Sequence, residues 1–183
     1  MTGGQLRLSV IGLTGSGKST FASLVEQEAT RAGRSHARVK LAAPLYRLQR
    51  EVYQVAGAPL PAGAQDQELM EALAAALRRI NPRSLADDFR RRLADAGADL
   101  VVNDDLRDPH VDAVVLRQEG FRIVRVRADE PVRLARLAGR ADLTRAERST
   151  RELDRIEPDL LVDNNRDLAA LRRRARDLIG GWL

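Results

Sequence analysis

Eight residues near the start of the chain carry the clearest chemical signal in the sequence, and they read Gly12-Leu13-Thr14-Gly15-Ser16-Gly17-Lys18-Ser19. They match the P-loop pattern, G-x-x-x-x-G-K-[ST], at every fixed position. An apolar run, 6–11, precedes them, and a segment with helical spacing, 20–31, follows. A strand that ends in a glycine-rich turn and continues into a helix leaves successive backbone N–H groups pointing at one anion-sized space. The sequence therefore predicts a triphosphate-binding site rather than a flexible glycine turn.

Within this loop, each residue type suits a role in phosphate binding. Glycine permits dihedral angles and close backbone approaches that a side chain would block. The Lys18 ammonium can reach the β- and γ-phosphates, and the Ser19 hydroxyl can bind Mg²⁺. We predict that the nucleotide-binding residues here are Gly12, Thr14, Gly15, Ser16, Gly17, Lys18, Ser19 and Thr20.

A second group of polar residues, Asp104, Asp105 and Arg107, follows the predicted strand 99–103, whose centre is the apolar run 100–102. Carboxylates just past the end of a buried parallel strand face the crevice at the carboxyl edge of the sheet, where such folds hold ligands. One of them can hold Mg²⁺ or position the acceptor hydroxyl, and we select Asp105 for both roles. The planar guanidinium of Arg107 suits a phosphate or carboxylate, so it can bind an anionic acceptor and neutralise charge during transfer. The alternative is an ordinary solvated turn.

Arginines recur in the last third of the chain, at Arg133, Arg136 and Arg140, and then at Arg145, Arg148 and Arg151. Phosphoryl transfer depends on electrostatic stabilisation of the charge that spreads over the phosphoryl oxygens. Mobile arginines that close over a nucleotide provide it and also exclude water. We therefore predict a lid over about 136–155, with Arg136 catalytic and Arg140 in contact with the nucleotide. The alternative is a solvated helix face with pairs such as Glu147 and Arg151.

The segments that must position these residues alternate between strand-like and helix-like patterns, which is typical of a parallel sheet covered by helices. Strands are predicted at 6–11, 37–41, 99–103, 121–126 and 160–162. Helices are predicted at 20–31, from 43, at 65–80, 84–96 and 109–119, from 131, and at 167–179. With 183 residues and no linker or repeat, the chain is expected to form one α/β domain, 1–183.

The composition excludes several classes of protein. Cysteine is absent, so the chain has neither disulfides nor a cysteine metal site. A formal charge of +5 suits a polyanionic partner, but aromatic residues, at 3%, are too few for the stacking platforms of single-strand nucleic-acid binders. No secretory signal or membrane-spanning run is evident. We expect a cytoplasmic protein, monomeric or homodimeric, with no nucleic-acid or membrane partner.

Together with the P-loop, five further segments, 41–45, 103–109, 120–126, 156–159 and 162–165, resemble the deoxynucleoside monophosphate kinases of the P-loop nucleotide kinase superfamily. The resemblance spans nearly the whole chain. It implies a three-layer α/β/α sandwich with a central five-stranded parallel sheet. It also implies transfer of the γ-phosphoryl group of ATP, with Mg²⁺, to a small phosphorylated or hydroxyl acceptor.

By the same resemblance, Asp105 and Arg107 match the Asp-x-Arg of the family, and the arginines from Arg133 to Arg140 match its lid. Asn164 matches the turn near the donor base. The acceptor is expected to bind a helical insertion at about 44–98.

The chain also departs from the family pattern. The family follows its arginine with an aromatic residue, proline, asparagine and glutamate, whereas this chain has Asp108-Pro109-His110-Val111. In the helices 65–96 only Phe89 can stack on an acceptor base, so we name Phe89 as a substrate-binding residue. Arg47 is our candidate for the acceptor phosphate, with Arg83 and Arg90 as weaker ones.

The leading hypothesis is a kinase of a nucleoside monophosphate-like acceptor. Because aromatic residues are few and the Asp108–Val111 segment has changed, a kinase of a specialised metabolite, such as a nucleoside-antibiotic-like intermediate, remains open. Dephospho-coenzyme A kinase has the same general plan. A hypothesis of another class is a regulatory P-loop NTPase that acts as a switch for a protein partner.

Overall fold

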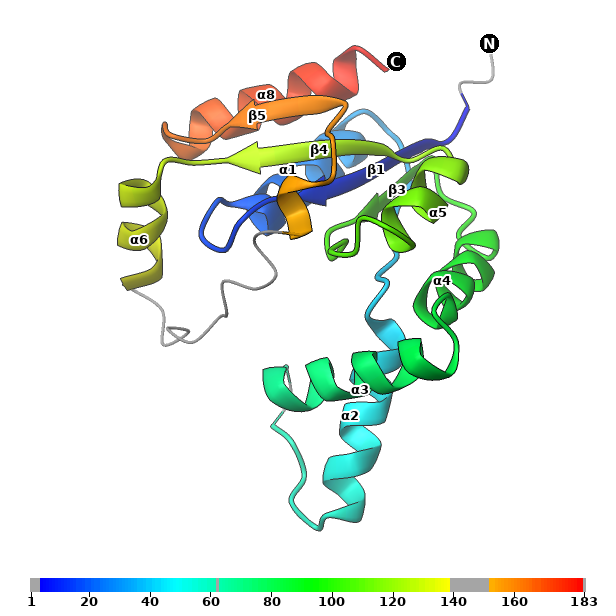
Figure 1. Ribbon diagram of the computed structural model, residues 1–183. Coiled ribbons are helices and arrows are strands. Elements are labelled where there is room, and N and C mark those ends of the chain that lie inside the picture. Colours follow the sequence, from blue (N-terminus) through cyan, green and yellow to red (C-terminus); the bar gives the residue numbers. More distant parts are fainter. Residues whose placement is uncertain (1–3, 62, 139–151, 183) are drawn as a thin grey trace.

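A parallel sheet of five strands forms the centre of the computed structural model, which describes residues 4–61, 63–138 and 152–182 (Figure 1). The strand order is β2-β3-β1-β4-β5, and all four strand pairings are parallel. The strands are β1 (Leu6–Ile11), β2 (His36–Arg38), β3 (Leu100–Asn103), β4 (Arg122–Arg127) and β5 (Leu160–Asp163). The chain thus crosses from one side of β1 to the other after β3. Ligands in open parallel sheets bind at such a reversal.

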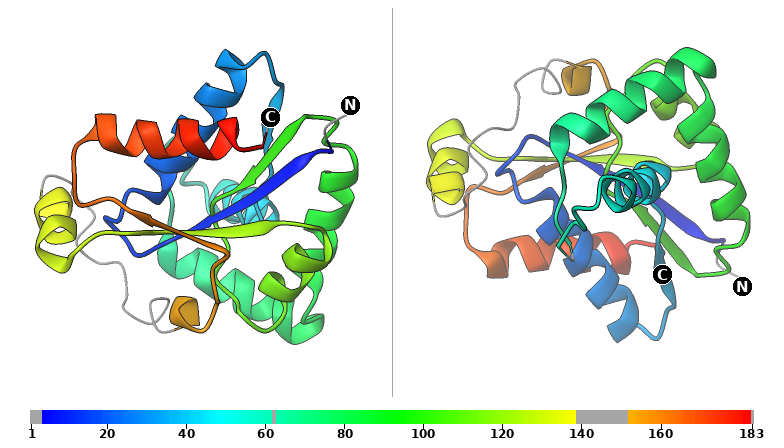
Figure 2. Two further views of the ribbon diagram at one scale, coloured as in Figure 1. Left: turned by 90° about the horizontal axis from the view of Figure 1, so that it is seen from above. Right: turned by 90° about the horizontal axis from the view of Figure 1, so that it is seen from below.

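Helices cover both faces of this sheet. On one face, α1 (Lys18–Arg31) and α8 (Leu168–Gly180) lie side by side, as Figure 2 shows, and enclose a core that includes Phe21, Val25 and Leu171. On the other face, α4 (Ser84–Ala94) and α5 (Asp112–Gln118) enclose a second core around Phe89, Leu116 and Ile123. The two cores confirm the predicted three-layer α/β/α arrangement with its five-stranded parallel sheet.

A smaller helical unit projects from the carboxyl edge of β3 and β1 (Figure 1). It consists of α2 (Ala43–Val55) and α3 (Gln67–Ile80), which lead into α4. Its own core is small and centres on Leu45, Met70 and Leu85. Helix α6 (Glu130–Ala138) follows β4 at the other side of the P-loop. No helix in the described part of the chain is long and apolar enough to cross a membrane.

Two element boundaries differ from the prediction for a physical reason that bears on the site. Strand β2 ends at Arg38 instead of residue 41, because the Leu41 and Ala42 amides donate to the Asp105 carboxylate at 2.9 Å each. Helix α5 begins at Asp112 instead of Pro109. The Asp108 carboxylate accepts hydrogen bonds from two backbone N–H groups of 110–111, at 2.8 Å each, and holds that stretch in a turn.

Candidate functional site

The P-loop occupies the turn between β1 and α1. At two of its glycines, the backbone conformation and close neighbours disfavour any side chain. Gly15 and Gly17 have φ angles of 81° and 92°, which side chains rarely adopt. A Cβ on Gly17 would lie 2.3 Å from Asn164 Nδ2, and one on Gly15 would lie 2.9 Å from the Arg133 carbonyl oxygen. The backbone of the loop is therefore packed against residues that arrive from β5 and α6.

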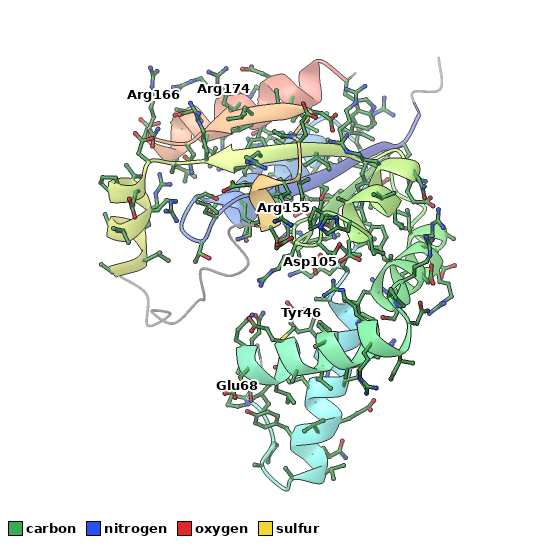
Figure 3. All side chains as sticks on the ribbon, viewed as in Figure 1. Tyr46, Glu68, Asp105, Arg155, Arg166 and Arg174 are labelled. Atoms are coloured by element: carbon green, nitrogen blue, oxygen red, sulfur yellow. The ribbon has the colours of Figure 1, made fainter. Side chains whose placement is uncertain are left out.

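A cavity of about 470 Å³ lies along the outer side of this loop, and we call it the donor cavity. Asn164, which is 5% exposed, donates from Nδ2 to the Ser16 carbonyl oxygen at 2.8 Å. The Arg136 guanidinium donates to the carbonyl oxygens of Asn164, at 3.0 Å, and Gly15, at 3.4 Å. Arg166, labelled in Figure 3, lines the same cavity at the start of α8. Of the predicted nucleotide-binding residues, seven line this cavity: Thr14, Gly15, Gly17, Lys18, Ser19, Thr20 and Asn164.

On the inner side of the loop, a cavity of about 150 Å³ brings the P-loop and the end of β3 together, and we call it the transfer cavity. Lys18 and Ser19 line it from α1, and Asp104, Asp105 and Arg107 line it from the segment after β3. Gly12 and Lys40 also lie in its wall. The structure therefore places the two chemical motifs of the sequence around one space.

The two aspartates of this space differ in how their oxygens are used. Asp105 Oδ1 accepts from Asn103 Nδ2 at 2.7 Å and from the Leu41 amide, and Oδ2 accepts from the Ala42 amide. Burial raises the pKa of Asp105, while these hydrogen bonds oppose the rise. Asp104 Oδ2 accepts from Arg38 at 3.1 Å, whereas Oδ1 is buried without a hydrogen bond and lies 3.7 Å from Lys40 Nζ. Of these two aspartates, Asp104 is therefore the one with an oxygen that accepts no hydrogen bond.

Arg107 is exposed and lines two cavities, the transfer cavity and a third one described below. It makes no hydrogen bond or ion pair with the described residues. Most other arginines nearby are paired: Arg38 with Glu26 and Asp104, and Arg92 with Asp88. A guanidinium with five N–H donors and no protein partner is suited to an anionic ligand.

A third cavity, of about 160 Å³, lies between α2, α3 and the start of α5, and we call it the acceptor cavity. Figure 3 shows Tyr46 on α2 facing the sheet edge that carries Asp105, and both residues line this cavity. Arg78 and Asp112, which the sequence reasoning missed, line its inner end and form an ion pair of 2.7 Å. The signal that could have found Asp112 is its position seven residues after Asp105, on the helix that follows the motif.

Two residues predicted to bind the acceptor lie elsewhere. Phe89 is fully buried and packs against Phe121, with ring centroids 5.6 Å apart, so it cannot stack on an acceptor. The reason is that α4 packs on the sheet face and turns this side chain into the core. Arg47 is on the solvent side of α2, 3.9 Å from Asp88. The weaker candidates are also paired outside the cavity, Arg83 with Asp87 and Arg90 with Glu119.

The predicted lid is described only at its two ends. Arg136 and Arg133 belong to α6, and Arg133 donates to the Thr14 carbonyl oxygen at 3.2 Å. Arg140 and the arginines at 145, 148 and 151 lie outside the described residues.

Solved structures resemble this fold along nearly the whole chain. TT1252 from Thermus thermophilus has a TM-score of 0.59 and 18% identity, covering 97% of this chain and 98% of that one. A shikimate kinase from Bacteroides thetaiotaomicron has a TM-score of 0.54 and 12% identity, covering 96% and 98%. The APS kinase CysC from Mycobacterium tuberculosis, solved with AMPPNP and APS, has a TM-score of 0.50 and 19% identity, covering 96% and 97%.

No protein-family model matches the sequence, and the search of curated proteins gave no match. Because the sequence identities to these three structures are below 20%, the similarity establishes the fold alone. The chain has the α/β fold of the P-loop kinases.

Proposed function

We propose that this chain is an ATP-dependent phosphotransferase that moves the γ-phosphoryl group to a small acceptor. The observation that carries the proposal is the continuity of the three cavities. The donor and transfer cavities share Lys18 and Ser19. The transfer and acceptor cavities share Tyr46, Asp105 and Arg107. A donor phosphate at the P-loop and an acceptor beside α3 would therefore meet at the residues best suited to phosphoryl transfer.

On the donor side, the proposed roles follow from position. The P-loop amides and Lys18 would hold the β- and γ-phosphates. Arg136 and Asn164, which are hydrogen-bonded to the P-loop and to each other, would border the nucleotide in the donor cavity. Arg107, which has no hydrogen-bond or ion-pair partner among the described residues, would neutralise the negative charge on the phosphoryl group during transfer.

The residues present also fit a magnesium ion that arrives with the nucleotide. Ser19 supplies a hydroxyl, and the Asp104 carboxylate has an oxygen without a hydrogen bond. Asp105 was our choice from the sequence, but its oxygens already accept three hydrogen bonds, so we propose Asp104 for this role and Asp105 as the residue that fixes the 39–42 loop. When bound, Mg²⁺ supplies charge neutralisation at the β- and γ-phosphates.

The acceptor cavity favours a smaller acceptor than a nucleoside monophosphate. The cavity is open to the transfer cavity, and its own volume of about 160 Å³ is close to that of an engineered cavity, about 150 Å³, that holds one benzene ring, so the enclosed part of the acceptor would be about one ring in size. Tyr46 is the one aromatic residue in its described wall, and Lys40 Nζ lies 5.8 Å from the centre of its ring. We therefore propose a one-ring acceptor with a hydroxyl group, in line with the specialised-metabolite alternative. Shikimate kinase and APS kinase show by their names that the fold serves other acceptors than nucleoside monophosphates.

The test is ATP consumption with Mg²⁺ against a panel of cyclic polyols, sugars, hydroxy acids and nucleoside monophosphates, with an acceptor-free control. An acceptor that stimulates ADP formation and gains one phosphate by mass supports the proposal. Turnover of common deoxynucleotides in preference to every small-ring acceptor would restore the nucleoside monophosphate hypothesis. Slow hydrolysis that no acceptor changes would favour the regulatory switch.

A further inference from the structure

The two ends of the acceptor cavity differ in charge. Its mouth, shared with the transfer cavity, is lined by Asp105 and Arg107. We call the part of its wall that the transfer cavity does not share the inner end, and the charged residues of that part are Glu71 and Arg78 on α3 and Asp112 on α5. The part of an acceptor that is not phosphorylated would face this inner end. The charges there therefore decide which chemical groups that part can carry.

Arg78 is the described cation at the inner end, and carboxylates already compensate it. Its Nη2 donates to Asp112 Oδ2 at 2.7 Å, and its Nε, which is buried without a hydrogen bond, lies 4.0 Å from Asp108 Oδ2. An acceptor carboxylate or phosphate placed here would be a third anion around one guanidinium. Like charges at such distances repel, and they do so more strongly where water is partly excluded.

The carboxylates at the inner end, in contrast, have unused accepting capacity. The Asp112 side chain is 3% exposed, and its Oδ1 has no hydrogen-bond partner. Glu71 is exposed, lines the cavity and accepts one hydrogen bond in the described part of the chain, from Gln67 Nε2 at 2.7 Å on Oε1. Ionised carboxylates accept hydrogen bonds and never donate them, so the groups that match them are hydroxyl and ammonium donors.

The titration of Asp112 agrees with this charge pattern. Burial raises the pKa of Asp112 to about 6, Arg78 opposes the rise, and Asp108 and Asp105 add to it. One more negative charge would raise this pKa further, whereas a positive charge would lower it.

We propose that the inner end of the acceptor cavity selects acceptors by charge. The acceptor presents hydroxyl or ammonium donors to Glu71 and Asp112 and carries no anionic group at that end. This inference rests on the proposed kinase function and names its substrate class as a one-ring polyol or amino-polyol. It separates this chain from enzymes whose acceptors are ring carboxylates or nucleotides.

Calorimetric titration of the full chain tests the inference without relying on turnover. The protein is first saturated with Mg-ADP, so that the P-loop cannot bind the probes. Glucosamine, glucose and glucuronate are then titrated near neutral pH, because they are rings of similar size that carry a positive, a neutral and a negative group. We expect glucosamine to bind about three- to fivefold more tightly than glucose, the scale of a partly exposed ion pair, and glucuronate to bind more weakly than glucose.

A matched pair of variants on α3 tests whether Glu71 causes the preference for glucosamine. Glu71→Gln should remove most of the glucosamine preference. Glu68→Gln, one turn earlier on α3 and outside the cavity wall, should keep it. Asp112→Asn should also reduce the preference. Normal Mg-ADP binding by each variant shows that it is folded.

The pH dependence gives a third readout on the unmodified protein. As pH falls from about 7 to about 5, Asp112 takes up a proton and loses its attraction for an ammonium group, so glucosamine affinity should fall more than glucose affinity. The charged groups that face Asp112 are Arg78 from α3, Asp108 from the turn before α5, and Asp105 from the end of β3. The affinity of Asp112→Asn should change less.

The outcomes separate the two proposals. Failure of Mg-ADP to bind would remove the proposed kinase function itself. Binding of Mg-ADP with glucuronate as the tightest probe, or with no binding of glucosamine and glucose, would overturn the charge selection alone. An unchanged glucosamine preference in Glu71→Gln would overturn it as well.

Discussion

The donor half and the acceptor half of this molecule are built in different ways. The donor half consists of one contiguous loop whose backbone is fixed by positive-φ glycines and by hydrogen bonds from Arg133, Arg136 and Asn164. The acceptor half is assembled from side chains of α2, α3 and α5 over a small core. On the proposed function, the donor half would bind phosphate through fixed backbone geometry together with the Lys18 charge, whereas side-chain charges alone would decide which acceptor binds. Each of the following predictions can break or sharpen this contrast.

The largest expected effect is that of Lys18→Ala. Lys18 lines both the donor and the transfer cavity, where the charge of the moving phosphoryl group changes most. We expect phosphoryl transfer to fall by about 100-fold or more, with the protein still folded. Steady-state kinetics and thermal unfolding measure the two effects. Wild-type turnover in this variant would contradict the proposed role of the P-loop.

Gly17→Ala should strongly weaken nucleotide binding, because its Cβ would lie 2.3 Å from Asn164 Nδ2. Gly33→Ala is the matched control, since Gly33 also has a positive φ, 71°, but a Cβ there meets nothing within 4 Å. Both variants should lose about 1 kcal/mol of stability from the unfavourable φ, and Gly17→Ala should lose more because the Asn164 side chain must also move. Only Gly17→Ala should lose ADP affinity, which calorimetry measures. Equal ADP affinity in the two variants would mean that the contact between the P-loop and Asn164 does not matter.

Arg107→Ala tests the border between the two halves. Because Arg107 lines the transfer and acceptor cavities but not the donor cavity, acceptor KM should rise and kcat should fall, together by about 10- to 100-fold in kcat/KM. The Kd for ATP should stay within about twofold. Arg47→Ala, on the solvent side of α2, serves as the control. A loss confined to ATP binding would move Arg107 into the donor half.

The same contrast explains what could be predicted from the sequence. The P-loop was predictable because its residues are adjacent and its glycines leave few backbone alternatives. The sheet and its flanking helices followed from the alternation of apolar segments, with β1 predicted at its observed bounds, Leu6–Ile11.

The acceptor half was harder to predict because its residues come from distant segments, and rotation of a helix by a fraction of a turn changes which side chain faces a cavity. The prediction that Phe89 binds the acceptor was wrong for that reason, because α4 turns this side chain into the core. Arg78 and Asp112 were missed because they are 34 positions apart and meet only through the packing of α3 near α5.

The last prediction concerns stability and follows from the ion pair at the inner end of the acceptor cavity. Because burial raises the pKa of Asp112 from 3.8 to about 6, the folded protein binds a proton there more tightly than the unfolded chain does. This group therefore stabilises the fold less as pH rises from about 4 to about 6, by up to about 3 kcal/mol, and its contribution is constant above that range. Asp112→Asn cannot titrate, so its free energy of unfolding relative to wild type should increase across this window.

Urea unfolding at several pH values measures this difference, and Asp87→Asn is its control. Asp87 also pairs with an arginine, Arg83 at 3.4 Å, but its side chain is 37% exposed, so its variant should follow the wild-type pH curve. A wild-type-like pH curve for Asp112→Asn as well would mean that water reaches the pair and that the inner end is less dry than its burial indicates. Because Asp112 lines the acceptor cavity and not the donor cavity, Asp112→Asn should keep its ADP affinity unchanged throughout the same window, and that result would show that the titration of Asp112 acts on the acceptor half alone.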